Sequence, residues 1–370
     1  IKLMSSKKDK SYNLDKYFMS IAMNLAIERN GLTGLNPSVG CLIVKNNKIL
    51  SFGQTGFTGR PHAESEAIRK CKNKELKDSS IYITMEPCTH YGKTPPCTNL
   101  IIKSKIKKVI YSINDVDERT RNKAYSFLKS KKIIVSKDLL KSEAKKIYKN
   151  YFLHKKNKHP YIAAKIACSN DHYISSKNKT ITNEYSRDVS HLLRYHFDSI
   201  LISSKTANSD NSKLSCRING LENYSPRRLI IDKDLKINKK SPIINDDKKN
   251  NTIIFHSSTD KKKINHLKSK GIKLNYTDLD VHNNIHLKKV FLKAYNIGIG
   301  SIIIEGGKTL TKSVLRDKLI NEFYLFKSNK NLGRLGKNNI SNFKKKITFF
   351  LKKKENIETF LDGDEITRYY

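Results

Sequence analysis

One histidine, one glutamate and two cysteines in the first half of the chain have types and spacings that suit metal-assisted hydrolysis. His62 and Glu64 lie two residues apart, and eight residues separate Cys88 from Cys97. An imidazole and two thiolates suit zinc, and three protein ligands leave the fourth position of the ion open for water. Zinc lowers the pKa of that water. We therefore predict one Zn²⁺ bound by His62, Cys88 and Cys97, with Glu64 as the catalytic carboxylate that moves protons.

Two other interpretations of the same residues are a closed structural zinc site and an unrelated set of core residues. A closed site needs a fourth protein ligand, and His90, between the two cysteines, is the obvious candidate. Its position in that loop favours contact with a substrate instead. The two motifs are weak separately, but their combination in this order, between expected strands and helices, favours the catalytic interpretation.

The chain is strongly basic, with 73 Lys and Arg against 34 Asp and Glu and a formal net charge of +39. Such a charge suits a polyanionic partner such as RNA, or it reflects a lysine-rich composition spread over solvated surfaces. The lysine runs at 261–263 and 344–346 lie in polar stretches without interleaved aromatic residues. This scatter favours the second interpretation, so we expect no specific nucleic-acid partner. A phosphorylated small substrate also suits a basic surface.

The remaining cysteines have no ligand-like spacing, and we expect structural roles for Cys41, Cys71, Cys168 and Cys216. No stretch is apolar over the length that a membrane crossing needs. Residues 1–10 are polar and lack the apolar segment of a signal peptide. We therefore expect a cytoplasmic protein with no membrane partner and no disulfide framework.

Apolar periodicity predicts an α/β organisation in two domains, which suits a chain of 370 residues. In the first half, we expect helices at 14–29, 62–71 and 97–104 and strands at 38–44, 48–52, 80–85 and 108–113. In the second half, we expect a helix at 184–195 and strands at 161–168, 199–203, 228–232, 252–256 and 301–305. The charged segment 137–158 is the expected junction between domains at 12–150 and 158–370. Residues 236–251 and 257–284 are polar and weakly patterned, which indicates surface loops.

The His-x-Glu and Pro-Cys…Cys motifs are together similar to the signature of zinc nucleobase deaminases. Deaminases of tRNA or free cytosine usually have two residues between the cysteines, whereas this chain has eight, ending in Gly-Lys-Thr-Pro-Pro-Cys at 92–97. With that loop, the Asn-Pro-Ser-Val-Gly-Cys segment at 36–41 and Asn114-Asp115, the chain resembles the family of bifunctional riboflavin-biosynthesis deaminase–reductases. The resemblance covers nearly the whole chain, including the order of the domains.

This resemblance implies an N-terminal cytidine-deaminase-like α/β/α sandwich followed by a dihydrofolate-reductase-like α/β domain. It implies deamination of 2,5-diamino-6-ribosylamino-4(3H)-pyrimidinone 5′-phosphate by zinc-activated hydroxide. The ribosyl group of the product is then reduced to a ribityl chain with NADPH. Asn36 and His90 are implied to contact the pyrimidine substrate, and the family suggests a homo-oligomer.

In the second half, residues 165–169, 181–183 and 305–307 resemble segments of the family's reductase domain. The resemblance implies that Lys165 and Glu305 act near the reacting sugar. The implied substrate-binding residues are Asn178, Arg194, Leu214, Arg217 and Glu305. The implied cofactor-binding residues are Ala167, Thr180, Thr206, Asp210, Gly307, Lys308, Thr309 and Leu310. Guanidinium groups suit phosphate, although in so basic a chain Arg194 and Arg217 also fit solvated surface charge, and Gly306-Gly307 also fits an ordinary tight turn.

The chain departs from the family pattern at several positions. In the first half, Thr55 stands where the family usually has histidine, and residues 119–123 replace a glycine-rich helix start. In the second half, Thr180 replaces a tryptophan, His172 replaces a glycine, and residues 328–333 lack a proline. Two alternatives therefore stand beside the bifunctional enzyme: a deaminase with a decayed second half, and an RNA-binding or RNA-editing deaminase. The long loop between the cysteines speaks against the RNA alternative.

Overall fold

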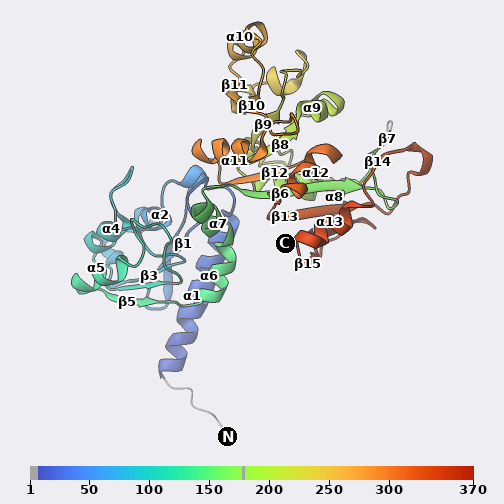
Figure 1. Ribbon diagram of the computed structural model, residues 1–370. Coiled ribbons are helices and arrows are strands. Elements are labelled where there is room, and N and C mark those ends of the chain that lie inside the picture. The colour runs from blue at the N-terminus through green and yellow to red at the C-terminus, as the bar shows by residue number, and fades with distance from the viewer. Residues whose placement is uncertain (1–6, 177–179) are drawn as a thin grey trace. The chain divides into compact units, whose positions relative to one another are not determined.

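The computed structural model describes residues 7–176 and 180–370. The chain divides into two compact units, the first ending at Lys158 and the second beginning at His159 (Figure 1). Each unit has a β-sheet covered by helices and a hydrophobic core of its own. Both are α/β, which confirms the predicted fold class. Within the described ranges, no helix combines the length and the apolar character that crossing a membrane requires.

The sheet of the first unit has five strands in the order β2-β1-β3-β4-β5. The strands are β1 (Gly40–Lys45), β2 (Lys48–Gln54), β3 (Ser80–Ile83), β4 (Lys108–Tyr111) and β5 (Ile134–Lys137). Strand β1 is antiparallel to β2 and β3, and the β3, β4 and β5 pairs are parallel. The turn between β1 and β2 has two left-handed residues, Asn46 and Asn47. Asparagine tolerates that backbone in a tight hairpin, and the strands predicted at 38–44 and 48–52 pair through this turn.

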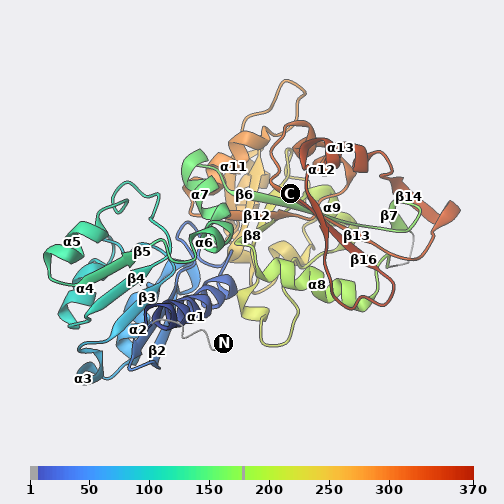
Figure 2. The same cartoon turned by 90° about the horizontal axis from the view of Figure 1, so that it is seen from below.

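Helices cover both faces of this sheet, which gives the predicted three-layer sandwich (Figure 2). One face carries α1 (Lys7–Glu28) and α6 (Lys141–Ile147). The other carries α2 (Ala63–Lys70), α4 (Cys97–Lys103) and α5 (Ala124–Ser130). The short α3 (Asn73–Leu76) and α7 (Lys149–Asn157) complete the unit. Because strand side chains alternate between faces, Gly40 meets α1, whereas its neighbour Cys41 is buried on the side of α2.

Helix α2 lies in close contact with β2 because Gly53 has no side chain. A Cβ atom at Gly53 would lie 2.1 Å from the carbonyl oxygen of Ala63 and 2.6 Å from the backbone nitrogen of Ala67. Two hydrogen bonds tie the same elements together. Ser51 Oγ donates to the Ala67 carbonyl at 2.8 Å, and the Gln54 backbone N–H donates to a Glu66 carboxylate oxygen at 2.6 Å. These contacts fix the first turn of α2 against the sheet.

The second unit is built on a nine-stranded sheet in the order β11-β10-β9-β8-β12-β6-β13-β16-β15. Its strands are β6 (Tyr161–Cys168), β8 (Ser199–Ser203), β9 (Arg227–Ile231), β10 (Thr252–His256), β11 (Lys273–Tyr276), β12 (Ser301–Ile304), β13 (Glu322–Lys327), β15 (Lys354–Asn356) and β16 (Glu365–Tyr369). The seven strands from β11 to β13 pair in parallel, and β16 and β15 add antiparallel pairs. A separate two-stranded ribbon pairs β7 (Tyr173–Ser176) with β14 (Gly336–Asn339).

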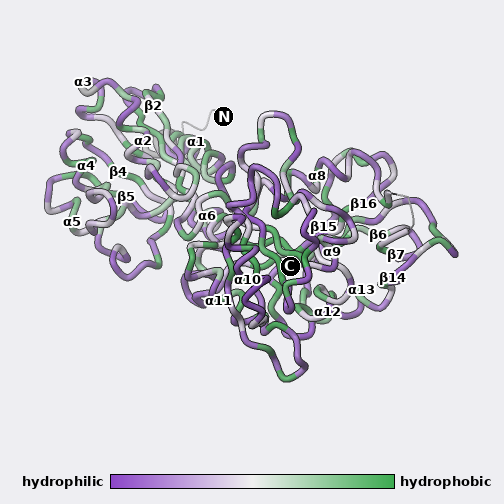
Figure 3. Tube along the Cα trace, turned by 90° about the horizontal axis from the view of Figure 1, so that it is seen from above, coloured by the Kyte–Doolittle hydropathy of each residue, from purple (hydrophilic) through white to green (hydrophobic). Residues whose placement is uncertain are grey.

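Helices of the second unit follow its strands. They are α8 (Glu184–Tyr195), α9 (Ser204–Asp210), α10 (Lys261–Ser269), α11 (Leu287–Asn296), α12 (Lys308–Arg316) and α13 (Phe343–Phe350). Hydrophobic residues concentrate in the interior of the unit, and its peripheral loops are largely hydrophilic with a few hydrophobic positions (Figure 3). The parallel strands therefore form the buried centre, with their carboxyl ends along one edge of the sheet.

One sequence expectation is corrected. Residues 257–284, expected to be surface loop, contain helix α10 and strand β11. Leu267 is the buried residue of α10, and β11 is an edge strand without a fully buried side chain. Neither element therefore has the apolar periodicity on which the expectation depended. Residues 236–251 contain only two short 3₁₀ turns, Pro242–Ile244 and Lys249–Asn251.

We expect Gly53→Ala to destabilise the first unit, because the new methyl group would overlap the backbone of α2. Overpacking of this kind costs about 1–3 kcal/mol. The measurement is urea unfolding followed by circular dichroism. Gly92→Ala is the matched control, since the nearest atom to its Cβ would be the flexible end of Arg60 at 3.5 Å. Equal unfolding midpoints for the two variants would contradict the close contact.

Candidate active sites

The predicted zinc ligands come together from three separate elements. His62 is the N-cap of α2, Cys97 is the first residue of α4, and Cys88 lies in the loop after β3. The His62 Nδ1 atom lies 3.3 Å from Cys97 Sγ and 3.6 Å from Cys88 Sγ. Tetrahedral zinc with bonds of about 2.0–2.3 Å places its ligand atoms about 3.5–3.8 Å apart. The three residues therefore fit a zinc ion.

The cluster favours a thiolate at Cys88. The Cys97 thiol, the His62 ring and the Cys97 backbone N–H all hydrogen-bond to the Cys88 sulfur, with the backbone nitrogen at 3.2 Å. These bonds lower the pKa of Cys88 to about 4, although burial opposes them. Among the residues that the structure describes, His62, Cys88 and Cys97 form a three-member group, and no fourth ligand joins it. The geometry supports an open site rather than a closed one.

Glu64 lies beside the cluster without belonging to it. It is in the first turn of α2 and only 4% exposed, and burial raises the pKa of its carboxyl. Glu64 lines a cavity of about 300 Å³ together with His62 and Cys88. Asn36 and His90, expected near the substrate, line the same cavity. A carboxylate with raised proton affinity next to a metal-bound water is suited to proton transfer.

Several residues that sequence reasoning did not assign also line this cavity. Four of them are basic: Arg60, Lys93, Arg119 and Lys155. Thr55, at the position where the family usually has histidine, accepts a hydrogen bond from the Val39 backbone N–H at 2.8 Å. The only signal for Arg119 in the sequence was the departure from the family at 119–123. Lys155 gave none, because it reaches the cavity from a helix far along the chain.

In the second unit, a second group of charged residues lies where β12 ends beside β6. Ala164 on β6 pairs with Ile304 on β12, so the next residues, Lys165 and Glu305, are neighbours. Lys165 Nζ lies 3.8 Å from Glu305 Oε2. Arg194, from α8, makes a bidentate ion pair with the Glu305 carboxylate at 2.7 and 2.9 Å. Ligands of open α/β sheets bind at this edge.

Hydrogen bonds and exposure distinguish Arg194 from Arg217, the two arginines expected to bind substrate. Arg194 also donates to the Ser215 carbonyl at 3.1 Å, so most of its donors are engaged within the protein. Burial raises the pKa of Glu305, but the charges of Arg194 and Lys165 outweigh burial and lower it to about 2. Arg217 is exposed, and its Nε donates to His191 Nε2 at 3.2 Å. Arg217 is therefore better placed than Arg194 to hold a phosphate.

His191 lies between the guanidinium groups of Arg194 and Arg217, and its imidazole ring is neutral. Its Nε2 accepts from Arg217, so Nδ1 carries the proton and faces the Ser215 carbonyl at 3.2 Å. Burial and the positive charges of Arg194 and Arg217 lower the pKa of His191 to about 4. With His191 neutral, Lys165 and Arg194 pair with the carboxylate of Glu305, and Arg217 adds a third positive charge beyond the His191 ring. The excess of positive charge suits an anionic ligand.

The residues expected to bind the cofactor lie in different places. Thr206 in α9 is next to Gly307, where a Cβ would lie 3.7 Å from Thr206 Oγ1. Gly307 is the N-cap of α12, and Lys308 and Thr309 are exposed in its first turn. Such a helix start suits a phosphate. Asp210 ends α9 and accepts a hydrogen bond from Ser209 Oγ.

Other expected residues lie apart from this group. The Leu310 side chain is buried in the hydrophobic core, so a ligand could meet this residue only through its backbone in the first turn of α12. Leu214 is also buried, with a left-handed backbone. Thr180 lines a cavity of about 490 Å³, and Ala167 lies on β6, paired with β13. Asn178 lies outside the described residues.

Comparison with known families assigns each half of the chain. Residues 12–113 match the family model described as the cytidine and deoxycytidylate deaminase zinc-binding region. Residues 160–359 match the model described as the RibD C-terminal domain. Together with the fold and the zinc cluster, these matches define a two-domain enzyme in which a zinc deaminase precedes a reductase.

Relatives match over most of the chain. The riboflavin biosynthesis protein RibD of Aquifex aeolicus is 30% identical over 350 residues, which cover 93% of this chain and 96% of the relative. RibD of Escherichia coli is 30% identical over 336 residues, covering 86% and 89%. The solved structure of a diaminohydroxyphosphoribosylaminopyrimidine deaminase/5-amino-6-(5-phosphoribosylamino)uracil reductase from Thermotoga maritima is 26% identical, with a TM-score of 0.77 and coverage of 97% and 99%. The chain belongs to the RibD family of bifunctional riboflavin-biosynthesis deaminase–reductases.

We expect Cys88→Ala to abolish zinc binding, because it removes one of three ligands from an open site. The wild type should contain about one zinc ion per chain and the variant close to none, as measured by inductively coupled plasma mass spectrometry. Cys71→Ala, which changes a buried cysteine outside the cluster, is the matched control and should retain zinc. Wild-type zinc content in the Cys88 variant would refute the ligand assignment.

Proposed function

We propose that the first unit removes the 2-amino group of 2,5-diamino-6-ribosylamino-4(3H)-pyrimidinone 5′-phosphate and releases ammonia. The second unit then reduces the ribosyl group of the product to a ribityl chain with NADPH. The single observation that carries the proposal is the cavity shared by His62, Cys88 and the buried Glu64. An open zinc site beside such a carboxylate suits hydrolytic removal of a ring amino group. We assign the two reactions to residues 12–150 and 158–370.

In the proposed deamination, Glu64 moves the protons. Bound zinc supplies a water molecule of lowered pKa for attack on the amino-bearing ring carbon. Glu64 takes one proton from that water and passes it to the ring nitrogen. It then takes the proton of the hydroxyl group added to the ring carbon and gives it to the amino group, which departs as ammonia. Glu64 is suited to this role by its place, because it is buried and lines the same cavity as His62 and Cys88. Asn36 and His90, which line the same cavity, orient the ring.

In the proposed reduction, Lys165 and Glu305 orient the reacting sugar, and Arg217 binds the phosphate. NADPH, when bound, supplies the hydride for C1′ of the opened ribose, and a proton completes the reduction. Burial lowers the pKa of Lys165, and the Glu305 carboxylate opposes that shift. Glu305 also directs Lys165 to one place, because their atoms lie 3.8 Å apart and Arg194 fixes the carboxylate from another side. Thr206 and Gly307, at the start of α12, are suited to a cofactor phosphate.

Two observations favour an active second half over a decayed one. His172, at the family's glycine position, has a φ of 67°, the left-handed backbone that glycine adopts without strain. Histidine at this position therefore still allows the backbone conformation that a glycine would favour. Lys165, Arg194 and Glu305 also lie together in one ion-pair cluster.

The proposal is tested by incubating zinc-loaded protein with the diaminopyrimidine phosphate, with and without NADPH, and following the products by mass spectrometry. We expect loss of one amino group without NADPH, and a gain of two hydrogen atoms when NADPH is added. Persistence of the deaminated product in the presence of NADPH would establish a deaminase with a decayed second half. Absence of deamination by the metal-replete protein would refute the central claim.

Glu64→Gln should lower kcat for deamination by about 10²- to 10⁴-fold, because glutamine cannot carry the proton. Its zinc content should stay unchanged, since Glu64 is not a ligand. Glu66→Gln is the matched control in the same helix: Glu66 is bonded to Gln54 and Lys70 and does not line the cavity. Steady-state kinetics with a metal assay decide between a proton carrier and a structural residue, because a structural defect would reduce zinc content together with kcat.

A further inference from the structure

The loop between β4 and α5, residues 112–123, forms part of the rim of the zinc cavity. We call it the rim loop. Glu86, buried beneath it, accepts hydrogen bonds from the backbone N–H groups of Asp115, Asn122 and Ala124 at 3.0–3.1 Å. One carboxylate therefore fixes both the beginning and the end of the segment. Asp115 is itself tied down, since its carboxylate accepts from Tyr151 Oη at 2.8 Å.

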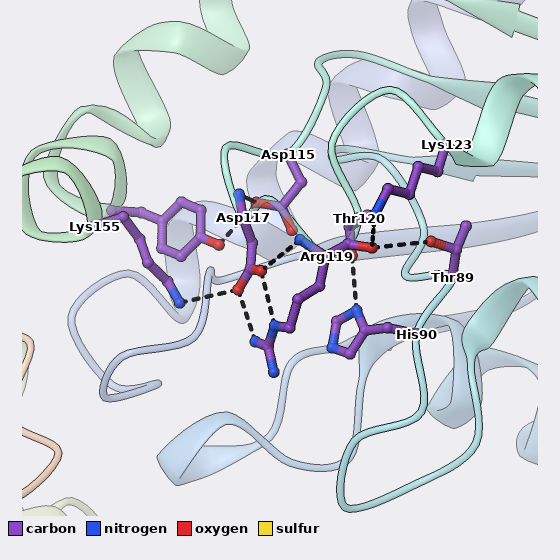
Figure 4. A network of polar contacts seen from close by, with 9 residues as sticks. Thr89, His90, Asp115, Asp117, Arg119, Thr120, Lys123 and Lys155 are labelled. Atoms are coloured by element: carbon purple, nitrogen blue, oxygen red, sulfur yellow. Dashed lines mark hydrogen bonds and ion pairs between the residues drawn. The ribbon is translucent and has the colours of Figure 1, made fainter.

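Arg119 is a residue of the rim loop whose side chain has a defined orientation at the cavity. Asp117 Oδ1 accepts from Arg119 Nε at 2.9 Å, and Asp117 Oδ2 accepts from Arg119 Nη2 at 2.7 Å. Lys155 Nζ lies 3.2 Å from the same Oδ2 atom, so the Asp117 carboxylate sits between two cations (Figure 4). The Arg119 side chain nevertheless remains 61% exposed, and Arg119 lines the cavity. Its orientation is fixed while its Nη1 side is left for a ligand.

Further contacts tie Arg119 to the zinc centre. Thr89 Oγ1 and Lys123 Nζ both donate to the Arg119 carbonyl, at 3.4 and 3.1 Å. His90 Nδ1 lies 3.0 Å from Thr120 Oγ1 (Figure 4). Thr89 and His90 directly follow the zinc ligand Cys88, so the rim loop and the metal-binding loop form one connected structure. The distance between the guanidinium and the metal centre is therefore constrained.

The charges of the rim suit a phosphate monoester. Arg60, Lys93, Arg119 and Lys155 line the cavity. Of the cavity's carboxylates other than Glu64, each is occupied within the protein: Glu86 by backbone N–H groups, Asp115 by Tyr151, and Asp117 by Arg119 and Lys155. A phosphate monoester carries close to two negative charges near neutral pH. Guanidinium groups bind its oxygens with charge-assisted hydrogen bonds.

We propose that Arg119, oriented by Asp117, binds the phosphate of the deaminase substrate and makes this unit select phosphorylated over unphosphorylated pyrimidine ribosides. The inference rests on the proposed function, because it takes the reacting ring to lie at the zinc centre. The phosphate then extends to the rim of the same cavity. Pre-orientation by Asp117 reduces the entropy that a long side chain loses on binding. Arg119 stands in the segment where this chain departs from the family's glycine-rich pattern, so this contact with the phosphate belongs to this chain's own sequence.

The test compares Arg119→Ala with Arg121→Ala, using the diaminopyrimidine 5′-phosphate and the same compound after phosphatase treatment. Arg121 is exposed in the same loop and does not line the cavity, so it is the matched control. We expect Arg119→Ala to raise KM for the phosphorylated compound by about 10- to 100-fold, the size expected for a lost charged hydrogen bond. KM for the dephosphorylated compound, kcat and zinc content should be unchanged. Asp117→Asn should raise the same KM several-fold, because it loosens Arg119.

Binding of the two compounds to zinc-loaded protein, measured by isothermal titration calorimetry, separates this inference from the proposed function. If the wild type binds the phosphorylated compound more tightly and Arg119→Ala removes that preference, the inference stands even where turnover fails. It is overturned if the wild type binds neither compound, or binds both equally well. It is also overturned if Arg119→Ala and Arg121→Ala weaken phosphate recognition to the same extent, since general surface charge would then explain it.

Discussion

The close approach of α2 to β2 is the constraint on which the chemistry of the first unit depends. Gly53 leaves so little space that the backbone of Ala63 rests against the strand. His62 and Glu64 are the residues directly before and after Ala63. The same contact therefore sets the position of a zinc ligand and of the carboxylate beside it. Cys88 and Cys97 come from other elements, and the three ligand atoms converge with α2 packed this closely against the sheet and held there by the Ser51 and Gln54 hydrogen bonds.

The fold could be predicted where burial imposes a pattern on the sequence. The apolar runs of β6, β8 and β10 were located at their observed bounds, since strands buried on both faces consist of continuous hydrophobic residues. Helix α10 and strand β11 were missed because they lie at the edge of the sheet, where lysine-rich, exposed positions hide the periodicity. Tertiary packing, rather than local preference, decides the structure of such segments.

The same distinction applies to the sites. His62, Glu64, Cys88 and Cys97 could be found because two short motifs carry the whole ligand set. By contrast, Arg194 and Glu305 form an ion pair although they are 111 residues apart in the sequence. Local sequence spacing cannot predict such a partner. The sequence assigned Arg194 to a ligand, whereas the structure directs its donors mainly into the protein. Residues that act through distant neighbours require the fold before their chemistry can be stated.

Glu86 gives the rim loop a property that bears on how such enzymes diversify. When hydrogen bonds among a loop's own side chains hold its backbone, a substitution in the loop can change the backbone path. Here the path is anchored from outside, by one buried carboxylate that binds N–H groups at both ends of the segment. Every amino acid except proline offers that N–H group. The side chains between these anchors can therefore change, and the loop can acquire contacts with new ligands. The geometry of the metal centre beside the loop does not change with them.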